Sequence, residues 1–104
     1  MSKYFNILGS TSVTTELIAP GDRNNIKSIL LTNVHDTADA TITLFIEHDP
    51  GNETRTAVKL LNTVAIPADS SLFLDNPSMF LFGEEFGLYL TVGSSDVIHV
   101  LVNQ

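Results

Sequence analysis

The sequence predicts an all-β fold, namely one antiparallel β-sandwich of the jelly-roll or immunoglobulin-like type that spans residues 1–104. Three observations carry this prediction. Turn-forming clusters recur at the short intervals typical of β-sandwiches, and the segments between them alternate apolar and polar residues with period 2. No segment has the apolar stripe of a helix. We therefore expect two packed sheets that enclose one core.

The first half of the chain contains the segments expected to form the first strands. They are KYFNIL (3–8), VTTELIA (13–19), IKSILLTNV (26–34) and ATITLFIEH (40–48). The last segment alternates most clearly, with Phe45 as the exception on its polar face. Its apolar face is expected to lie in the core and consists of Ala40, Ile42, Leu44 and Ile46.

The second half of the chain continues the pattern. The expected strands are TAVKLL (56–61), SSLFLD (70–75), FGLYLTV (86–92) and VIHVLV (97–102). In the third of these, Phe86, Leu88, Leu90 and Val92 share the core face. The last strand is apolar on both faces, so it is expected to be central in its sheet or to lie in an interface.

Proline and glycine mark the expected ends of several strands. Asp49-Pro50-Gly51-Asn52 has the residues of a type II turn between two antiparallel strands. Pro67 and Pro77 cannot donate a ladder hydrogen bond and hold the preceding residue extended. They bound the short apolar run in which Leu72 and Leu74 are expected to face the core.

Composition excludes several classes of function. The chain has 12 Asp plus Glu against 5 Lys plus Arg, a formal net charge of −7, which would repel a phosphate backbone. Cysteine is absent, which removes thiolate chemistry and Cys-ligated zinc. The N-terminal segment is too short and interrupted to be a signal peptide or a membrane span. We expect a soluble, unprocessed protein that binds neither nucleic acid nor membrane and needs no cofactor.

Histidines are the first residues to test for catalysis. His35 and His48 lie at expected loop edges, as solvated histidines do, and His99 lies within a strand, where a half-buried, hydrogen-bonded side chain is expected. A Ser94, His99 and Asp96 relay lacks the nucleophile elbow of hydrolases. The sequence therefore predicts that the protein is not an enzyme and has no catalytic residues.

Acidic residues lie mostly in the expected loops. Oxygen-rich loops can bind calcium, and Asp36 and Asp39 are the pair considered for such a site. The spacing of an EF-hand is absent. Solvated charges are the simpler interpretation, so no metal site is assigned.

An unusually apolar segment lies between two expected turns, where four consecutive apolar residues exceed what one face of a strand needs. One interpretation is a plug that closes one end of the core. The other is burial in a subunit or partner interface, because interfaces favour Phe and Met. Together with two N-terminal aromatic residues, the candidate interface set is Tyr4, Phe5, Met79, Phe80 and Phe82.

The spacing of apolar and turn residues also resembles a known group of proteins. The segments that carry this resemblance are IKSILLTN (26–33), ATITLFIE (40–47), IPADSSL (66–72), FGLYLTV (86–92) and DVIHV (96–100). Over residues 14–102 the chain resembles the small β-sandwich structural proteins of tailed phages, particularly marine and cyanobacterial ones. Such proteins often carry Gly at the place of Asp69, where a left-handed turn residue is expected.

The resemblance implies a non-enzymatic virion protein. A head decoration or cement protein on the capsid exterior is the first expectation, and a tail- or fibre-associated structural or glycan- or receptor-binding module is the alternative. The implied partners are the major capsid protein or another virion protein, with a homo-oligomer such as a trimer. The implied location is the virion, on the head rather than the tail, after synthesis in the host cytoplasm.

Overall fold

Antiparallel β-strands make up most of the described part of the protein. The computed structural model describes residues 2–9, 13–19, 21, 26–48, 56–76, 80, 86–93 and 96–104. The strands in chain order are β1 (Ser2–Gly9), β2 (Val13–Ile18), β3 (Ser28–Asn33), β4 (Ala40–His48), β5 (Thr56–Ile66), β6 (Ser71–Leu74), β7 (Phe86–Val92) and β8 (Asp96–Asn103). Each lies on a segment that the alternation of the sequence predicts, which confirms the all-β class.

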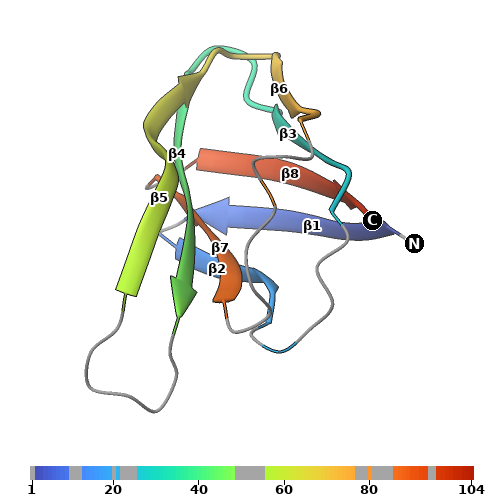
Figure 1. Ribbon diagram of the computed structural model, residues 1–104. Coiled ribbons are helices and arrows are strands. Elements are labelled where there is room, and N and C mark those ends of the chain that lie inside the picture. Colours follow the sequence, from blue (N-terminus) through green and yellow to red (C-terminus); the bar gives the residue numbers. More distant parts are fainter. Residues whose placement is uncertain are drawn as a thin grey trace.

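The strands form two four-stranded sheets with the orders β1-β8-β3-β6 and β2-β7-β4-β5. Their pairing is nested, because β1 pairs with β8, β2 with β7, β3 with β6 and β4 with β5. A long antiparallel hairpin that is rolled into two sheets has this pairing, which is the jelly roll. Figure 1 shows β1 (blue) beside β8 (red) in one layer and β4 beside β5 in the other. Of the two sandwich types expected, the topology therefore selects the jelly roll.

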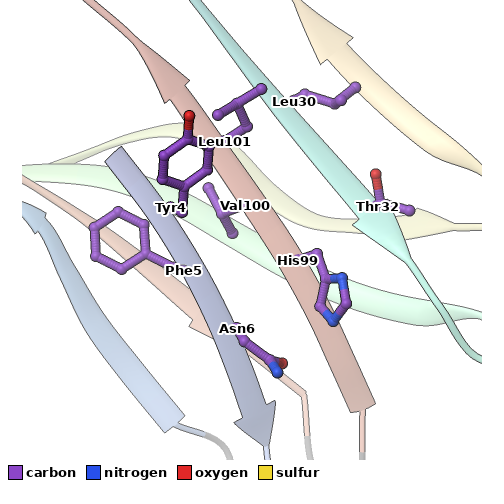
Figure 2. A pocket seen from close by; sticks show the side chains of 8 residues that line it. All are labelled: Tyr4, Phe5, Asn6, Leu30, Thr32, His99, Val100 and Leu101. Carbon is purple, nitrogen blue, oxygen red and sulfur yellow. The ribbon is translucent and has the colours of Figure 1, made fainter. Parts of the chain in front are cut away.

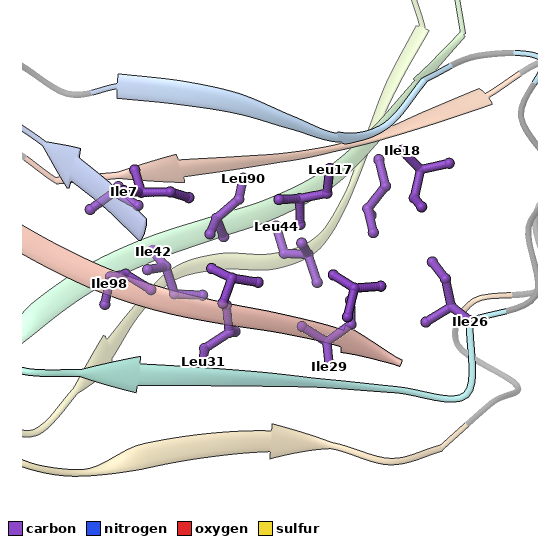
Figure 3. Close-up of a cluster of buried hydrophobic side chains, with 14 of the residues drawn as sticks. Ile7, Leu17, Ile18, Ile26, Ile29, Leu31, Ile42, Leu44, Leu90 and Ile98 are labelled. Atoms are coloured by element: carbon purple, nitrogen blue, oxygen red, sulfur yellow. The ribbon is translucent and has the colours of Figure 1, made fainter. Parts of the chain in front are cut away.

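The core lies between the two sheets, and the side chains of Figure 3 fill it from both. The predicted core face of β4 is confirmed, since Ala40, Ile42, Leu44 and Ile46 are buried. Leu88, Leu90 and Val92 of β7 are buried as well, with Phe86 packed against the cluster. Leu72 and Leu74 of β6 also pack against the core, as the sequence predicts.

β8 is a central strand, with β1 on one side and β3 on the other. Its inner residues Ile98, Val100 and Val102 belong to the core. The apolar residues of its outer face, Val97 and Leu101, are only half-buried. Packing in the core thus accounts for the apolar inner face of this strand. It does not account for the apolar outer face, which lies at the surface of the sheet.

β5 is longer than expected, because it continues beyond residue 61 to Ile66. A β-bulge lies within it, where Ile42 pairs with Val64 but Leu44 pairs with Leu61. Thr63 has a φ of 52° in this bulge, and its backbone N–H donates to Thr43 Oγ1 at 3.0 Å. The bulge interrupts the period-2 pattern, which is why the alternation predicts an early end.

The turn before β6 depends on a left-handed residue. Ser70 N donates to Pro67 O at 3.2 Å, and Asp69 at the third position of the turn has a φ of 56°. The expectation of a left-handed residue at Asp69 is therefore confirmed. Pro67 marks a strand end, as predicted, although the strand it ends is the extended β5. The expected turn at residues 49–52 lies outside the described residues.

Candidate functional site

One row of apolar side chains crosses the outer face of the β1-β8-β3-β6 sheet. Strand register places Tyr4 opposite Leu101, Leu101 opposite Leu30, and Leu30 opposite Phe73. Each strand of the sheet contributes one residue, so the row runs across the strands from β1 to β6. We call Tyr4, Leu101, Leu30 and Phe73 the apolar row.

A polar row lies next to it, two residues further along β1. Asn6 pairs with His99, His99 with Thr32, and Thr32 with Ser71. The hydroxyl oxygens of Thr32 and Ser71 are hydrogen-bonded, 2.9 Å apart. We call Asn6, His99, Thr32 and Ser71 the polar row. Both rows lie on the same face of the sheet, because residues two apart along a strand point to the same side.

The two ends of the apolar row are strongly exposed, with 77% of Tyr4 and 54% of Phe73 accessible to solvent. Leu30 and Leu101 between them are half-buried. A hollow of about 410 Å³ lies over the sheet, lined on the outer face by residues of both rows. Figure 2 shows Tyr4, Leu101 and Leu30 in one line and Asn6, His99 and Thr32 in a second. This face combines exposed apolar area with a concave surface.

The outer face of the other sheet is different in character. One of its rows consists of Thr14, Thr91 and Thr43, with Thr14 Oγ1 and Thr91 Oγ1 2.8 Å apart. The next row carries charges at both ends and aromatic rings between them. Its members are Glu16, Tyr89, Phe45 and Lys59.

Those central rings already have partners within the chain. Phe45 and Tyr89 stack with centroids 5.6 Å apart, and the Tyr89 hydroxyl donates to Glu16 Oε2 at 3.3 Å. A threonine-rich face with charged ends suits contact with water.

The apolar and polar rows contain no acidic side chain. The chain as a whole has 12 Asp plus Glu. A neutral face on an acidic protein matches the centres of protein interfaces, from which charged residues are depleted. Among the faces that the described residues form, this one therefore has the character of a binding surface.

The described histidines take no catalytic arrangement. His99 was expected to be half-buried, but its side chain is exposed on the outer face. Asp96 lies on the opposite face of β8, where its Oδ2 accepts the backbone N–H of Thr41 at 3.1 Å. Asp96 and His99 are therefore not a pair, and Ser94 lies outside the described residues.

His35 has a structural role in the loop after β3. Its Nδ1 accepts the backbone N–H groups of Thr37 and Ala38, each at 3.2 Å. These two bonds of His35 hold the turn that leads into β4. His48 is the last residue of β4.

The loop that carries the considered calcium pair has exposed acidic residues, Asp36 and Asp39. Within the described residues, no group of three His, Cys, Asp or Glu could hold a metal ion. The same residues include no helix long and apolar enough to cross a membrane.

The candidate interface residues fall in different places. Tyr4 lies in the apolar row, whereas Phe5 is half-buried on the inner face and packs against the core. Phe80 is 1% exposed and belongs to the core. Met79 and Phe82 lie outside the described residues.

The remaining residues of the apolar row were not singled out from the sequence. Leu30, Leu101 and Phe73 lie on three separate strands and adjoin only through register. The apolar outer face of β8 was the one sequence signal that could have indicated them.

The fold is similar to that of PirA, whose crystal structure has been solved. The superposition has a TM-score of 0.59 and 12% sequence identity, and it covers 99% of this chain and 93% of PirA. No family model and no curated protein matches the chain. At this identity the likeness to PirA shows the fold, which extends over nearly the whole of both chains.

The resemblance to phage virion proteins is wrong, because a solved structure that shares the fold over nearly the whole chain is PirA. The head decoration role, the tail- or fibre-associated alternative and the virion location are corrected with it. So are the implied partners, a capsid or other virion protein and a homo-oligomer. The resemblance rested on apolar spacing and turn residues, and these are set by the jelly roll rather than by one group of its members.

Proposed function

We propose that this chain is a non-enzymatic binding subunit, acting as one domain over residues 1–104, that attaches to a different protein through the outer face of the β1-β8-β3-β6 sheet. The apolar row is the observation that carries the proposal. It crosses every strand of the sheet and ends in two exposed aromatic side chains, Tyr4 and Phe73. The likeness to PirA supports the jelly roll as the scaffold, and the site supports the function.

Burial of this row favours association. Removal of a Phe, Leu or comparable apolar side chain from water contributes about 1.5–3 kcal/mol before the cost of association is subtracted. Tyr is among the residues that dominate binding energy, because its ring is large and rigid and its hydroxyl can find a partner. The half-buried Leu30 and Leu101 give the centre of the row little side-chain freedom to lose on binding.

Charge favours a different protein over a second copy. Two copies of this chain would each carry a formal charge of −7, so their approach is opposed by repulsion. The face itself is neutral, which suits a partner with an apolar centre and a neutral or basic surround. We therefore expect the isolated chain to sediment as a monomer and the complex to contain two different proteins.

Photo-crosslinking followed by reconstitution tests the proposal. Tyr4 is replaced with the photoreactive residue p-benzoylphenylalanine, and Ala65, exposed on the other sheet, is replaced in a control. The crosslinked protein from cells that make the chain naturally is identified and purified. It is then titrated by calorimetry with the unmodified chain and with the Tyr4→Asp, Phe73→Asp and Ala65→Asp variants.

The expected result is a 1:1 complex that Tyr4→Asp and Phe73→Asp each weaken by about 100-fold, whereas Ala65→Asp changes Kd by less than about threefold. Circular dichroism should show that all three variants remain folded, since each changed side chain is exposed. Equal losses for the three variants would overturn the proposal. So would sedimentation of the isolated chain as an oligomer that Phe73→Asp dissociates, because a second copy would then occupy the face.

A further inference from the structure

We propose that the hollow between the apolar and polar rows receives one neutral aromatic side chain that carries a hydrogen-bonding group, a tyrosine or tryptophan of the partner. This inference rests on the proposed function, since it names the chemistry that the partner presents to the same face. It concerns the part of the face bounded by Tyr4, Leu30, Leu101, Asn6 and His99.

The hollow has two unlike walls. On one side the ring of Tyr4 and the side chains of Leu30 and Leu101 present carbon atoms. On the other side Asn6, His99 and Thr32 present amide, imidazole and hydroxyl groups. A ligand that fills this space touches an apolar wall and a hydrogen-bonding wall at the same time.

The polar wall is able to bond to a ligand. Thr32 is engaged with Ser71, 2.9 Å away. Within the described part of the chain, the side chains of Asn6 and His99 make no hydrogen bond. An amide both donates and accepts, and a neutral imidazole does the same through its two nitrogens. This wall can therefore accept a hydrogen bond from a hydroxyl or an indole N–H. It can also donate a hydrogen bond to a hydroxyl oxygen.

The lining excludes other classes of side chain. A purely aliphatic side chain would cover Asn6 and His99 without offering a hydrogen bond, so the lost water contacts would not be replaced. A carboxylate or ammonium would find no opposite charge, because none of the lining residues is Asp, Glu, Lys or Arg. Tyr and Trp have an apolar ring and a polar edge, which matches the two walls.

The volume agrees with this occupant. A hollow of about 410 Å³ lies toward the lower end of the range of about 300–1,000 Å³ typical of small-molecule sites. It is large enough for one aromatic ring with part of its backbone. The ring of Tyr4 beside it can stack with the incoming ring in an offset or edge-to-face arrangement.

A titration with p-cresol, the side chain of tyrosine without its backbone, tests the inference on the isolated chain. Methyl and imidazole resonances are followed by ¹H–¹³C NMR. We expect saturable shifts at the methyl groups of Leu30 and Leu101 and at the ring of His99. Toluene, which lacks the hydroxyl, should bind roughly fivefold more weakly, and p-toluate, which adds a negative charge, should bind more weakly still.

A double variant makes the test sharper. Asn6→Leu and His99→Leu together replace the free polar groups with apolar ones at exposed positions, so folding should be retained. In this variant the preference for p-cresol over toluene should disappear. Equal affinity for p-cresol and toluene in the unmodified chain would overturn the inference, as would the absence of saturable shifts at these residues.

The experiments distinguish failure of this inference from failure of the proposed function. If p-cresol does not bind while Phe73→Asp still abolishes the complex, the inference fails and the binding face stands. If p-cresol binds with the expected preference while Tyr4→Asp and Phe73→Asp leave the complex intact, the hollow does select a hydroxylated aromatic ring, but the proposed function fails and the partner does not supply that ring.

Discussion

The side chain of Asn33 joins the end of β3 to the end of β5, because its Nδ2 donates to the carbonyl oxygen of Ile66 at 3.0 Å. The same Nδ2 donates to Ala38 O at 2.9 Å, and its Oδ1 accepts the backbone N–H of His35 at 2.9 Å. Asn33 is fully buried, so water cannot replace these bonds. One amide therefore ties both sheets to the loop that connects β3 with β4.

Asn33→Asp is expected to lower the free energy of unfolding by about 3 kcal/mol. A carboxylate cannot donate to Ala38 O and Ile66 O, and each buried polar group left without a partner costs about 1–3 kcal/mol. Urea denaturation at neutral pH measures the change. As a control, Asn62→Ala at an exposed position should cost less than about 1 kcal/mol. A loss no larger than that of the control would show that the Asn33 bonds contribute little.

Thr63→Asn is expected to stabilise the protein by up to about 1 kcal/mol. Thr63 has a φ of 52°, a left-handed conformation that is unfavourable for a β-branched residue and tolerated by Asn. Its backbone bond to Thr43 Oγ1 is kept in the variant. The same substitution at Thr14, in the extended strand β2, should be destabilising because Asn is disfavoured in strands. Thermal unfolding of both variants measures the sign, and a lower Tm for Thr63→Asn would contradict the strain argument.

Gly93→Ala is expected to destabilise the connection between β7 and β8 by about 1–3 kcal/mol. A Cβ at this position would lie 2.5 Å from Thr41 Oγ1 and 2.7 Å from Asp96 Oδ2. Relief of the clash would disturb the bond that Thr41 N donates to Asp96 Oδ2. In a double-mutant cycle, Thr41→Ala should recover part of the loss, because it removes the nearer oxygen. Strict additivity of the two changes would argue against steric conflict.

The strands could be predicted from the sequence because their signals are local. Alternation over residues 40–48 and 86–92 and the prolines at strand ends are visible without any tertiary information. The bulge at Thr63 could not be predicted, since a bulge is a property of register between two strands. The choice of the jelly roll over the immunoglobulin type also depends on pairing, which distant parts of the chain decide together.

The candidate site was only partly predictable for the same reason. Tyr4 could be singled out as an aromatic residue in an N-terminal strand, and the outer face of β8 was visibly apolar. The row itself exists only because Leu30, Leu101 and Phe73 meet across three strands. The resemblance to virion proteins failed because apolar spacing reports the fold and carries no information about the residues on its outer face.

Phe80 and Phe73 provide a matched pair that separates core from surface, because the same side chain is 1% exposed at one position and 54% exposed at the other. Phe80→Ala is expected to cost about 3–5 kcal/mol, since it leaves a cavity in the core. Phe73→Ala should cost less than about 1 kcal/mol, because solvent already reaches the ring.

Urea denaturation of both variants measures the two losses, and calorimetric titration with the partner measures the effect of Phe73→Ala on binding. The core-plug interpretation of Phe80 and the surface role of Phe73 predict opposite outcomes in the two assays. Phe80→Ala should change stability strongly, whereas Phe73→Ala should change affinity at nearly constant stability. Similar stability losses for the two variants would mean that Phe73 belongs to the hydrophobic core rather than to the binding face. The apolar row would then no longer include Phe73.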